Sequence, residues 1–162
     1  MAFSNNATRL LDSRKINYVL HEYDYDSGVH SAVEVAGAIG LPEERVFKTL
    51  VALPDQPNAK PVLAVIPGAE SLDLKLLAKA LKVKKARMAS HAQAEELTGL
   101  QTGGISPLML VNKGFRVFLD EHALAHETIA VSAGQRGANL EMAPDALAKV
   151  TKARVVALCG DG

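Results

Sequence analysis

The stretch that decides the fold is Val46-Phe47-Lys48-Thr49-Leu50-Val51-Ala52-Leu53. Its nearly continuous apolar run predicts a strand that is buried on both faces of a sheet. Lys48 is the only charged residue in the run. Because a buried and unpaired ammonium is costly, we expect Lys48 either to reach water at an edge of the sheet or to face a polar cavity. The first alternative is an ordinary half-exposed lysine, and the second is a binding site.

Turn signals and periodicity on both sides of this strand predict further short elements. A turn cluster at residues 54–58 and an apolar run at 62–66 predict an antiparallel partner strand, so the pair forms a central hairpin. Helices are predicted at 6–15, 31–40, 71–81 and 90–99 and from Pro144, with Ser31, Ser71 and Ser90 as N-caps. Other strands are predicted at 18–23, 85–88, 108–111, 115–119, 128–131 and 154–158, with a second hairpin spanning 108–119.

This element pattern predicts the fold class. About seven short strands with helices inserted irregularly indicate an α+β fold: a mixed, largely antiparallel sheet or barrel with peripheral helices. No regular βαβ alternation appears in the sequence. The length of 162 residues fits one domain, which we expect to span residues 1–162.

Composition narrows the class of protein. Hydrophobic residues make up 48% and charged residues 22%, as is typical of a soluble globular chain, and no apolar run approaches the roughly 20 residues of a membrane span. The first six residues lack the features of a secretory signal, and Cys159 is the only cysteine. We therefore expect a cytoplasmic protein without internal disulfides, in which Cys159 is a buried apolar thiol rather than a nucleophile.

The formal net charge is zero, with 18 basic and 18 acidic residues, so any polyanion must be bound by a local patch. The segment 75–87 contains six basic residues and no acidic one: Lys75, Lys79, Lys82, Lys84, Lys85 and Arg87. The first three are spaced for one helix face. This basic stripe is either a solvated helix face or a set of phosphate contacts. No aromatic residue interleaves it, so base stacking is not expected on this surface.

Two loops that contain glycine are candidate ligand contacts, at residues 103–107 and 132–137. Glycine lets backbone N–H groups approach a carbonyl or phosphate group, and two such donors can stabilise an oxyanion. Taken alone, each loop is better explained as a simple turn. Together with Lys48, they predict a shared pocket.

A metal site is not expected. His122 and His126 are four residues apart, as in some zinc sites, but no other histidine shows spacing that completes a set of ligands. The acidic residues Glu22, Asp24 and Asp26 lack an EF-hand pattern and predict a solvated turn. We expect no cofactor.

Four sequence blocks, in this order along the chain, resemble one known family: residues 46–50, 72–81, 103–108 and 131–137. The sequence resembles the YbaK-like family of free-standing aminoacyl-tRNA editing domains. This family includes the bacterial Cys-tRNA(Pro) deacylases and is related to the editing insertion of bacterial prolyl-tRNA synthetases. The resemblance extends over nearly the whole chain.

The resemblance implies a trans-editing deacylase that removes a mischarged small amino acid, cysteine first, from tRNA(Pro). It implies catalytic roles for Lys48, Gly103 and Gly104 and no protein nucleophile, because the substrate's own thiolate attacks the ester. The substrate-binding residues that it implies are Tyr23, Thr49, Ile105, Ser106, Pro107, Ser132, Ala133, Gly134, Arg136, Gly137 and Asn139. The basic stripe would contact the tRNA backbone. The expected partner is charged tRNA, with prolyl-tRNA synthetase in a transient complex as a further candidate, and neither DNA nor a membrane is expected.

Two departures from the family pattern leave the amino acid open. Ser31-Ala32 stands where many members have an aromatic-glycine pair, and Asn139 stands where the Cys-specific pattern has an acid. Asn139 cannot act as a carboxylate base. The alternatives are a deacylase for alanine or another aminoacyl-tRNA that uses water, and a noncatalytic adaptor that binds tRNA or a synthetase.

Overall fold

The computed structural model describes residues 3–160. In this range the α-helices are α1 (Asn6–Ser13), α2 (Ala32–Ile39), α3 (Leu74–Leu81), α4 (His91–Thr98) and α5 (Pro144–Thr151). The strands are β1 (Val19–Glu22), β2 (Phe47–Pro54), β3 (Val62–Pro67), β4 (Ala86–Met88), β5 (Arg116–Asp120), β6 (Ile129–Ser132), β7 (Ala138–Met142) and β8 (Arg154–Val156). Short 3-10 turns are η1 (Tyr25–Ser27), η2 (Glu43–Arg45), η3 (Pro107–Met109) and η4 (Glu121–Ala125).

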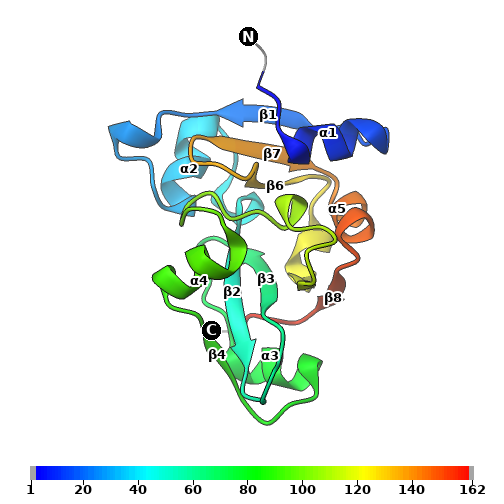
Figure 1. The fold of residues 1–162 in the computed structure, drawn as a ribbon. Coiled ribbons are helices and arrows are strands. Elements are labelled where there is room, and N and C mark those ends of the chain that lie inside the picture. Colours follow the sequence, from blue (N-terminus) through cyan, green and yellow to red (C-terminus); the bar gives the residue numbers. More distant parts are fainter. Residues whose placement is uncertain (1–2, 161–162) are drawn as a thin grey trace.

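The strands form two sheets. The larger has the order β4-β2-β3-β5-β8, and the smaller has the order β1-β7-β6. The smaller sheet lies with α1 and α2 at the top of Figure 1, and α3 packs near β4 at the bottom. A bridge between Val46 and Ala130 connects the two sheets. The predicted α+β class and the mixed, largely antiparallel pairing are confirmed, although β3-β5 and β5-β8 are parallel and the described strands do not close into a barrel.

The central hairpin is confirmed, with Lys48 opposite Ile66 in the register of β2 and β3. Every residue of β3 is buried, because one face packs into the core that contains Leu63 and Val65 and the other into the core that contains Ala64. β2 is different. Its residues 48–50 are only half-buried, because β4 pairs with β2 only at residues 52–54.

Local capping chemistry explains where the helices begin. The capping boxes predicted at Ser31 and Ser90 are both present. The third helix begins later than predicted: its cap is Asp73 rather than Ser71, because the Asp73 carboxylate accepts the N–H groups of Lys75 and Leu76. The Asp73 N–H in turn donates to the carbonyl of Leu158 at 2.8 Å, which fixes this turn to the end of the chain.

Two predictions between residues 100 and 142 are wrong. Residues 108–111 do not form the predicted strand but lie in η3 and the turn after it, because Pro107 opens a tight turn and the Ser106 hydroxyl accepts the Leu108 N–H. The strand that follows, β5, therefore pairs in parallel with β3 and not in a hairpin. The sequence prediction also missed β7, in which Ala138, Leu140 and Met142 are buried.

Candidate active site

A hollow of about 550 Å³ lies between the two sheets, at the edge of β2. Residues 47–51 of β2 form one wall. The other walls come from the start of α2, from the segment that joins β4 to α4, from the loop at residues 102–105, and from Ser132 and Asn139 at the ends of β6 and β7. The two loops predicted from glycine content thus lie beside the predicted lysine strand.

The edge of β2 is open along this wall. The Val51 carbonyl accepts a hydrogen bond from the Ala89 N–H at 3.0 Å, and pairing with β4 begins at Ala52. Alternate residues of a strand direct their peptide groups toward the same edge. The peptide groups of Thr49 therefore point in the same direction as those of Val51, past the end of β4 and toward the hollow.

Lys48 lines the hollow together with Gly103, Ser132 and Asn139. Its side chain is half-buried. Among residues 3–160, no carboxylate oxygen lies within 4.0 Å of its ammonium group. Of the two alternatives for Lys48, the structure favours the cavity, in which the ammonium lacks a protein counter-ion and can accept one from a ligand.

Two hydroxyl groups in the same hollow are also without partners. The side-chain oxygens of Thr49 and Thr102 are buried and have no hydrogen-bond partner of good geometry among the described residues. The Glu95 carboxylate, which accepts the Thr102 N–H at 2.8 Å, lies close enough to the Thr102 hydroxyl for that hydroxyl to help lower the pKa of Glu95. Leaving such a group unsatisfied costs about 1–3 kcal/mol. Each oxygen has almost no surface open to the hollow, so a polar ligand would recover this energy only after the threonine side chain rotates toward it. Thr102 was not among the predicted residues, and its position next to Gly103 is the only signal that pointed to it.

Tyr23 and Asn139 form part of the hollow that lies against the smaller sheet. Burial raises the pKa of the Tyr23 phenol, while the neighbouring Gly137 backbone and the Asn139 side chain act in the opposite direction. The phenol therefore stays protonated at neutral pH. Asn139 is buried, and its amide makes one local bond to the Ala138 carbonyl at 3.3 Å. This uncharged amide leaves that part of the hollow without an acid.

The structure brings together only some of the predicted residues. Those that line the hollow are Tyr23, Lys48, Thr49, Gly103, Ile105, Ser132 and Asn139. The other predicted residues do not line it: Gly104, Ser106, Pro107, Ala133, Gly134, Arg136 and Gly137. The sequence prediction missed the wall formed by His30, Met88 and His91, because no local motif distinguishes these residues from ordinary surface positions.

The glycines behind the hollow allow close packing. A Cβ atom on Gly104 would lie 2.9 Å from the Cα of Gln135, so the two loops touch only because this position has no side chain. The Gly104 N–H also donates to the Gln101 carbonyl at 2.8 Å. The expectation that Gly103 and Gly104 both offer free amides is therefore not met at Gly104. Gly134 similarly provides space for Met109.

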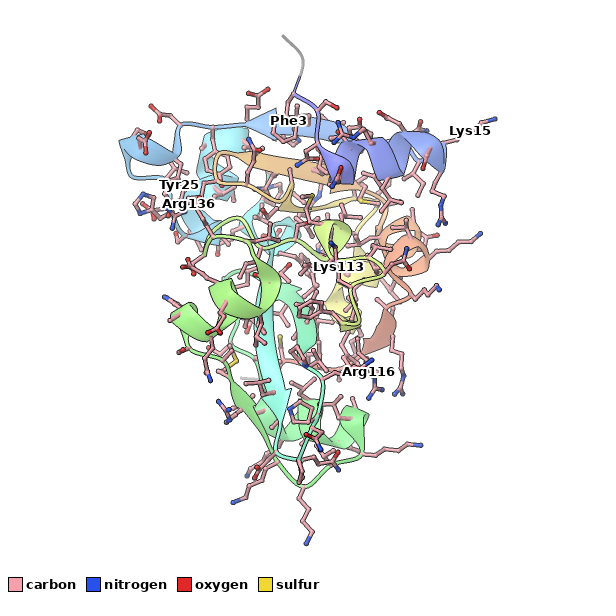
Figure 2. All side chains as sticks on the ribbon, viewed as in Figure 1. Phe3, Lys15, Tyr25, Lys113, Arg116 and Arg136 are labelled. Atoms are coloured by element: carbon pink, nitrogen blue, oxygen red, sulfur yellow. The ribbon has the colours of Figure 1, made fainter. Side chains whose placement is uncertain are left out.

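Arg136 joins the loops behind the hollow. Its Nε donates to the Thr102 carbonyl at 2.8 Å, and its guanidinium lies 4.7 Å from the centre of the Tyr25 ring. Figure 2 shows the two side chains together at one side of the molecule. Arg136 therefore connects the loop at 132–137 to the loop at 102–105 and to η1, and holds the rim of the hollow.

None of the six residues of the basic stripe lines the hollow. They lie along α3, β4 and the turn between them, at the bottom of Figure 1. Arg87 immediately precedes Met88, which does line the hollow. The basic stripe therefore ends next to the rim, and none of its residues lies inside the hollow.

Cys159 is buried, as predicted. Burial, and next the nearby Asp120 carboxylate, raise the pKa of the thiol to about 12, so the thiolate form is negligible at neutral pH. In residues 3–160 no three His, Cys, Asp or Glu side chains cluster in a way that could hold a metal ion. None of the helices in the same range is long and apolar enough to cross a bilayer.

Comparison with known proteins gives consistent matches. Residues 26–150 match a family model described as "Aminoacyl-tRNA editing domain". A protein of Enterococcus faecalis named "Putative Cys-tRNA(Pro)/Cys-tRNA(Cys) deacylase EbsC" is 40% identical over 146 residues, which are 90% of this chain and 87% of that protein. A proline–tRNA ligase of Pediococcus pentosaceus is 30% identical over 114 residues, which are 69% of this chain and 19% of the ligase.

Solved structures share the fold. A crystal structure described as "a putative trans-editing enzyme for prolyl tRNA synthetase" has a TM-score of 0.79 and 26% identity, covering 98% of this chain and 99% of that chain. The crystal structure of hypothetical protein APE2540 has a TM-score of 0.86 and 23% identity, covering 96% and 100%. The second match shows similarity of fold alone.

Proposed function

Because the chain belongs to the aminoacyl-tRNA editing domain family, we propose that it is a trans-acting aminoacyl-tRNA deacylase that removes mischarged cysteine from tRNA(Pro). The relative from Enterococcus faecalis, named for this activity, supports the substrate. The similarity to part of a proline–tRNA ligase supports a transient association with that synthetase. The reaction would take place in the cytoplasm, where tRNA is charged.

The observation that carries the proposal is the set of groups in the hollow. It contains an ammonium without a counter-ion and two hydroxyls without partners. These groups can bind a polar ligand, but they form no nucleophile–base pair. Thr49 makes no hydrogen bond to a base, and the Ser132 hydroxyl accepts the Gly134 N–H. Such a site binds and positions an ester whose nucleophile comes from elsewhere.

In the proposed reaction, the thiolate of the bound cysteine attacks its own ester carbonyl. A carbon–sulfur bond forms, and the carbonyl oxygen becomes an oxyanion. The carbon–oxygen bond to the terminal ribose then breaks, and the proton lost by the thiol returns to the ribose oxygen. The products are tRNA with a free 3′ end and a cyclic thiolactone.

Lys48 and Gly103 have the electrostatic roles. The Lys48 ammonium contacts the terminal ribose or its phosphate and holds the ester in place. The Gly103 N–H stabilises the oxyanion, a contribution that is typically worth about 100- to 1,000-fold in rate. Tyr23, Thr49 and Thr102 position the aminoacyl group by hydrogen bonds.

A panel of mischarged tRNAs tests the proposal. Cysteine, alanine and serine are each placed on tRNA(Pro) and on their own tRNAs, and ester cleavage is measured with the full chain. Cleavage of Cys-tRNA(Pro) with release of thiolactone supports the proposal. As a matched control, S-methylcysteine on tRNA(Pro) has no free thiol and should stay intact. Absence of cleavage in every lane would leave only a noncatalytic adaptor.

One observation favours a second candidate, a deacylase that removes alanine with water. Asn139 is buried in the wall of the hollow and carries no charge that could deprotonate a thiol. Cysteine and alanine differ by one small group, and an apolar pocket separates such neighbours by only about 1–3 kcal/mol. Equal cleavage of Ala-tRNA(Pro) and of the S-methylcysteine control would select this candidate.

A further inference from the structure

We propose that His30, supported by Tyr25 and Arg136, is a stacking platform for the terminal base of the RNA. The proposal rests on the proposed function and deepens it, because it assigns one part of the substrate to one part of the hollow. His30 lines the hollow and its side chain is exposed. It was not among the residues predicted from sequence.

Three side chains form a layered stack at the rim. The rings of Tyr25 and His30 have centroids 4.2 Å apart and planes 22° apart. The Arg136 guanidinium lies 4.7 Å from the centre of the Tyr25 ring. Tyr25 therefore contacts both Arg136 and His30. The imidazole has one face against Tyr25 and the other turned away from it, and its side chain is exposed.

The stack is held firmly from behind. His30 Nε2 lies 3.0 Å from the Tyr25 carbonyl, which can only accept, so Nε2 carries the proton and the ring orientation is fixed. Arg136 is held by the Thr102 carbonyl. A Cβ atom on Gly103 would lie 3.3 Å from the Tyr25 ring, so Tyr25 packs directly on this glycine. A rigid platform of this kind loses little entropy when a ligand stacks on it.

The position fits the substrate. In aminoacyl-tRNA the terminal ribose carries both the ester and the base, so a platform for the base must lie one ribose away from the site of the ester carbonyl. The proposed function places that carbonyl at Gly103. Tyr25 touches Gly103 and His30 extends the stack along the rim of the hollow. The ester and the base can therefore be bound at the same time.

The local charge favours a neutral base over a phosphate at this place. Asp24 and Asp26 lie on either side of Tyr25 in sequence. The Ser31 N–H is the main cause that lowers the pKa of the Glu34 carboxyl, and His30 adds to this effect. Glu34 therefore lies close to His30. Together with the single positive charge of Arg136, these three carboxylates leave the local charge negative, which disfavours a phosphate group. The phosphates are better placed along the basic stripe, which has no aromatic residue.

The test compares two RNA minihelices that differ in one base. One ends in the normal terminal adenosine, and the other ends in an abasic ribose. Binding of both uncharged RNAs to the full chain is measured, followed by cleavage of the same RNAs carrying cysteine. The protein variants are His30→Ala, His30→Phe and, as a control on the same part of the chain, Val33→Ala, which is exposed and does not line the hollow.

Stacking of one base is worth about 1–3 kcal/mol, so His30→Ala should weaken binding of the adenosine-ended RNA by about 5- to 150-fold. It should leave binding of the abasic RNA unchanged. His30→Phe should restore binding, and Val33→Ala should have no effect. In cleavage, the loss should appear in KM rather than in kcat. Equal effects of His30→Ala on both RNAs, or no effect on either, would overturn the platform.

The outcome separates this inference from the proposed function. If no ester is cleaved but binding still depends on the terminal base and on His30, the platform stands and the deacylase fails. If cleavage is normal and His30→Ala changes the affinity for both RNAs by the same factor, the proposed deacylase activity is supported. The three side chains then serve only to connect the loops. Tyr25→Ala is a second variant, whose thermal unfolding reports that structural role directly.

Discussion

The ammonium of Lys48 is the single group on which the proposed activity should depend most. It faces the hollow and no described carboxylate neutralises it. We expect Lys48→Ala to lower kcat/KM for Cys-tRNA(Pro) by about 100- to 1,000-fold, the typical loss for one preorganised electrostatic contact. Because β2 is already paired along β3, the variant should fold.

The control for this variant is Lys60→Ala, which removes a lysine outside the hollow. Steady-state deacylation and thermal unfolding are measured for both variants. A fall in kcat would assign Lys48 to the transition state, and a rise in KM alone would make it a ground-state anchor. A folded Lys48→Ala protein with near-normal cleavage would remove Lys48 from the mechanism.

A second residue, Glu141, should contribute to the decrease in the free energy of unfolding as the pH falls. The Thr128 hydroxyl lowers the pKa of the Glu141 carboxyl most, and His21 and Arg45 add to the effect. A carboxyl group whose pKa is lower in the folded state stabilises the protein above its unfolded pKa, about 4.5. This contribution is lost as the pH falls through the folded pKa.

Glu141→Gln should therefore lower the free energy of unfolding at pH 7 and flatten its decline below about pH 4.5. The measurement is denaturant unfolding at a series of pH values. Glu121→Gln is the matched control, because Glu121 is exposed in η4. If the two variants gave parallel curves, Glu141 would not be a source of the pH dependence.

At the scale of elements, the contact between the loops at 102–105 and 132–137 should be the contact whose packing tolerates an added side chain least. The loops meet where Gly104 approaches Gln135. Gly104→Ala would place a Cβ atom 2.9 Å from the Cα of Gln135, and overpacking of this kind costs about 1–3 kcal/mol. We expect a lower melting temperature together with a higher KM, since the rim of the hollow would move.

Gly37→Ala is the matched glycine variant. Gly37 lies in α2, and an added Cβ atom would meet nothing within 4 Å. Replacing glycine by alanine within a helix gains about 0.5–1 kcal/mol, so this variant should be more stable with unchanged kinetics. Thermal unfolding and deacylation of the pair measure both effects. A Gly104→Ala protein as stable as the original would show that the two loops are not tightly joined.

Elements with local signals could be predicted from the sequence, and those set by distant contacts could not. Ser31 and Ser90 carry their own capping boxes, so both helix starts are correct. In contrast, β5 pairs with β3, more than fifty residues earlier, which no local pattern indicates. β7 was missed because its alternating buried residues are short and interrupted by Asn139 and Glu141. In the candidate site, Lys48 could be found because it breaks an apolar run, whereas His30 carries no such signal.

At the scale of the whole molecule, zero net charge conceals a separation of charges. The basic stripe occupies α3 and β4, at one end of the molecule. Residues 22–45, which run from the end of β1 through η1, α2 and η2, carry one basic residue, Arg45, and six acidic residues: Glu22, Asp24, Asp26, Glu34, Glu43 and Glu44. The hollow lies between these regions, since residues of α2 and β4 both line it. An RNA approaching the hollow should therefore be oriented with its backbone toward the stripe.

Salt dependence of tRNA binding tests this orientation. Each lysine that contacts a phosphate adds about 0.7–0.9 to the slope of log affinity against log salt concentration. Lys79→Ala and Lys84→Ala should each reduce the slope by this amount. Lys15→Ala is the control, because this lysine lies far from the stripe at the end of α1 (Figure 2). If Lys15→Ala changed the slope as much as Lys84→Ala, binding would be diffuse rather than directed by the stripe.

The enclosure of Cys159 would protect the protein from the product of the proposed reaction. In the proposed reaction, the thiolactone product could acylate an accessible protein thiolate, because a new thioester bond would form as the carbon–sulfur bond of the ring breaks. The one cysteine of this chain is both buried and held in the unreactive protonated form. A thiolactone released by the proposed reaction would therefore meet no reactive thiol in this protein.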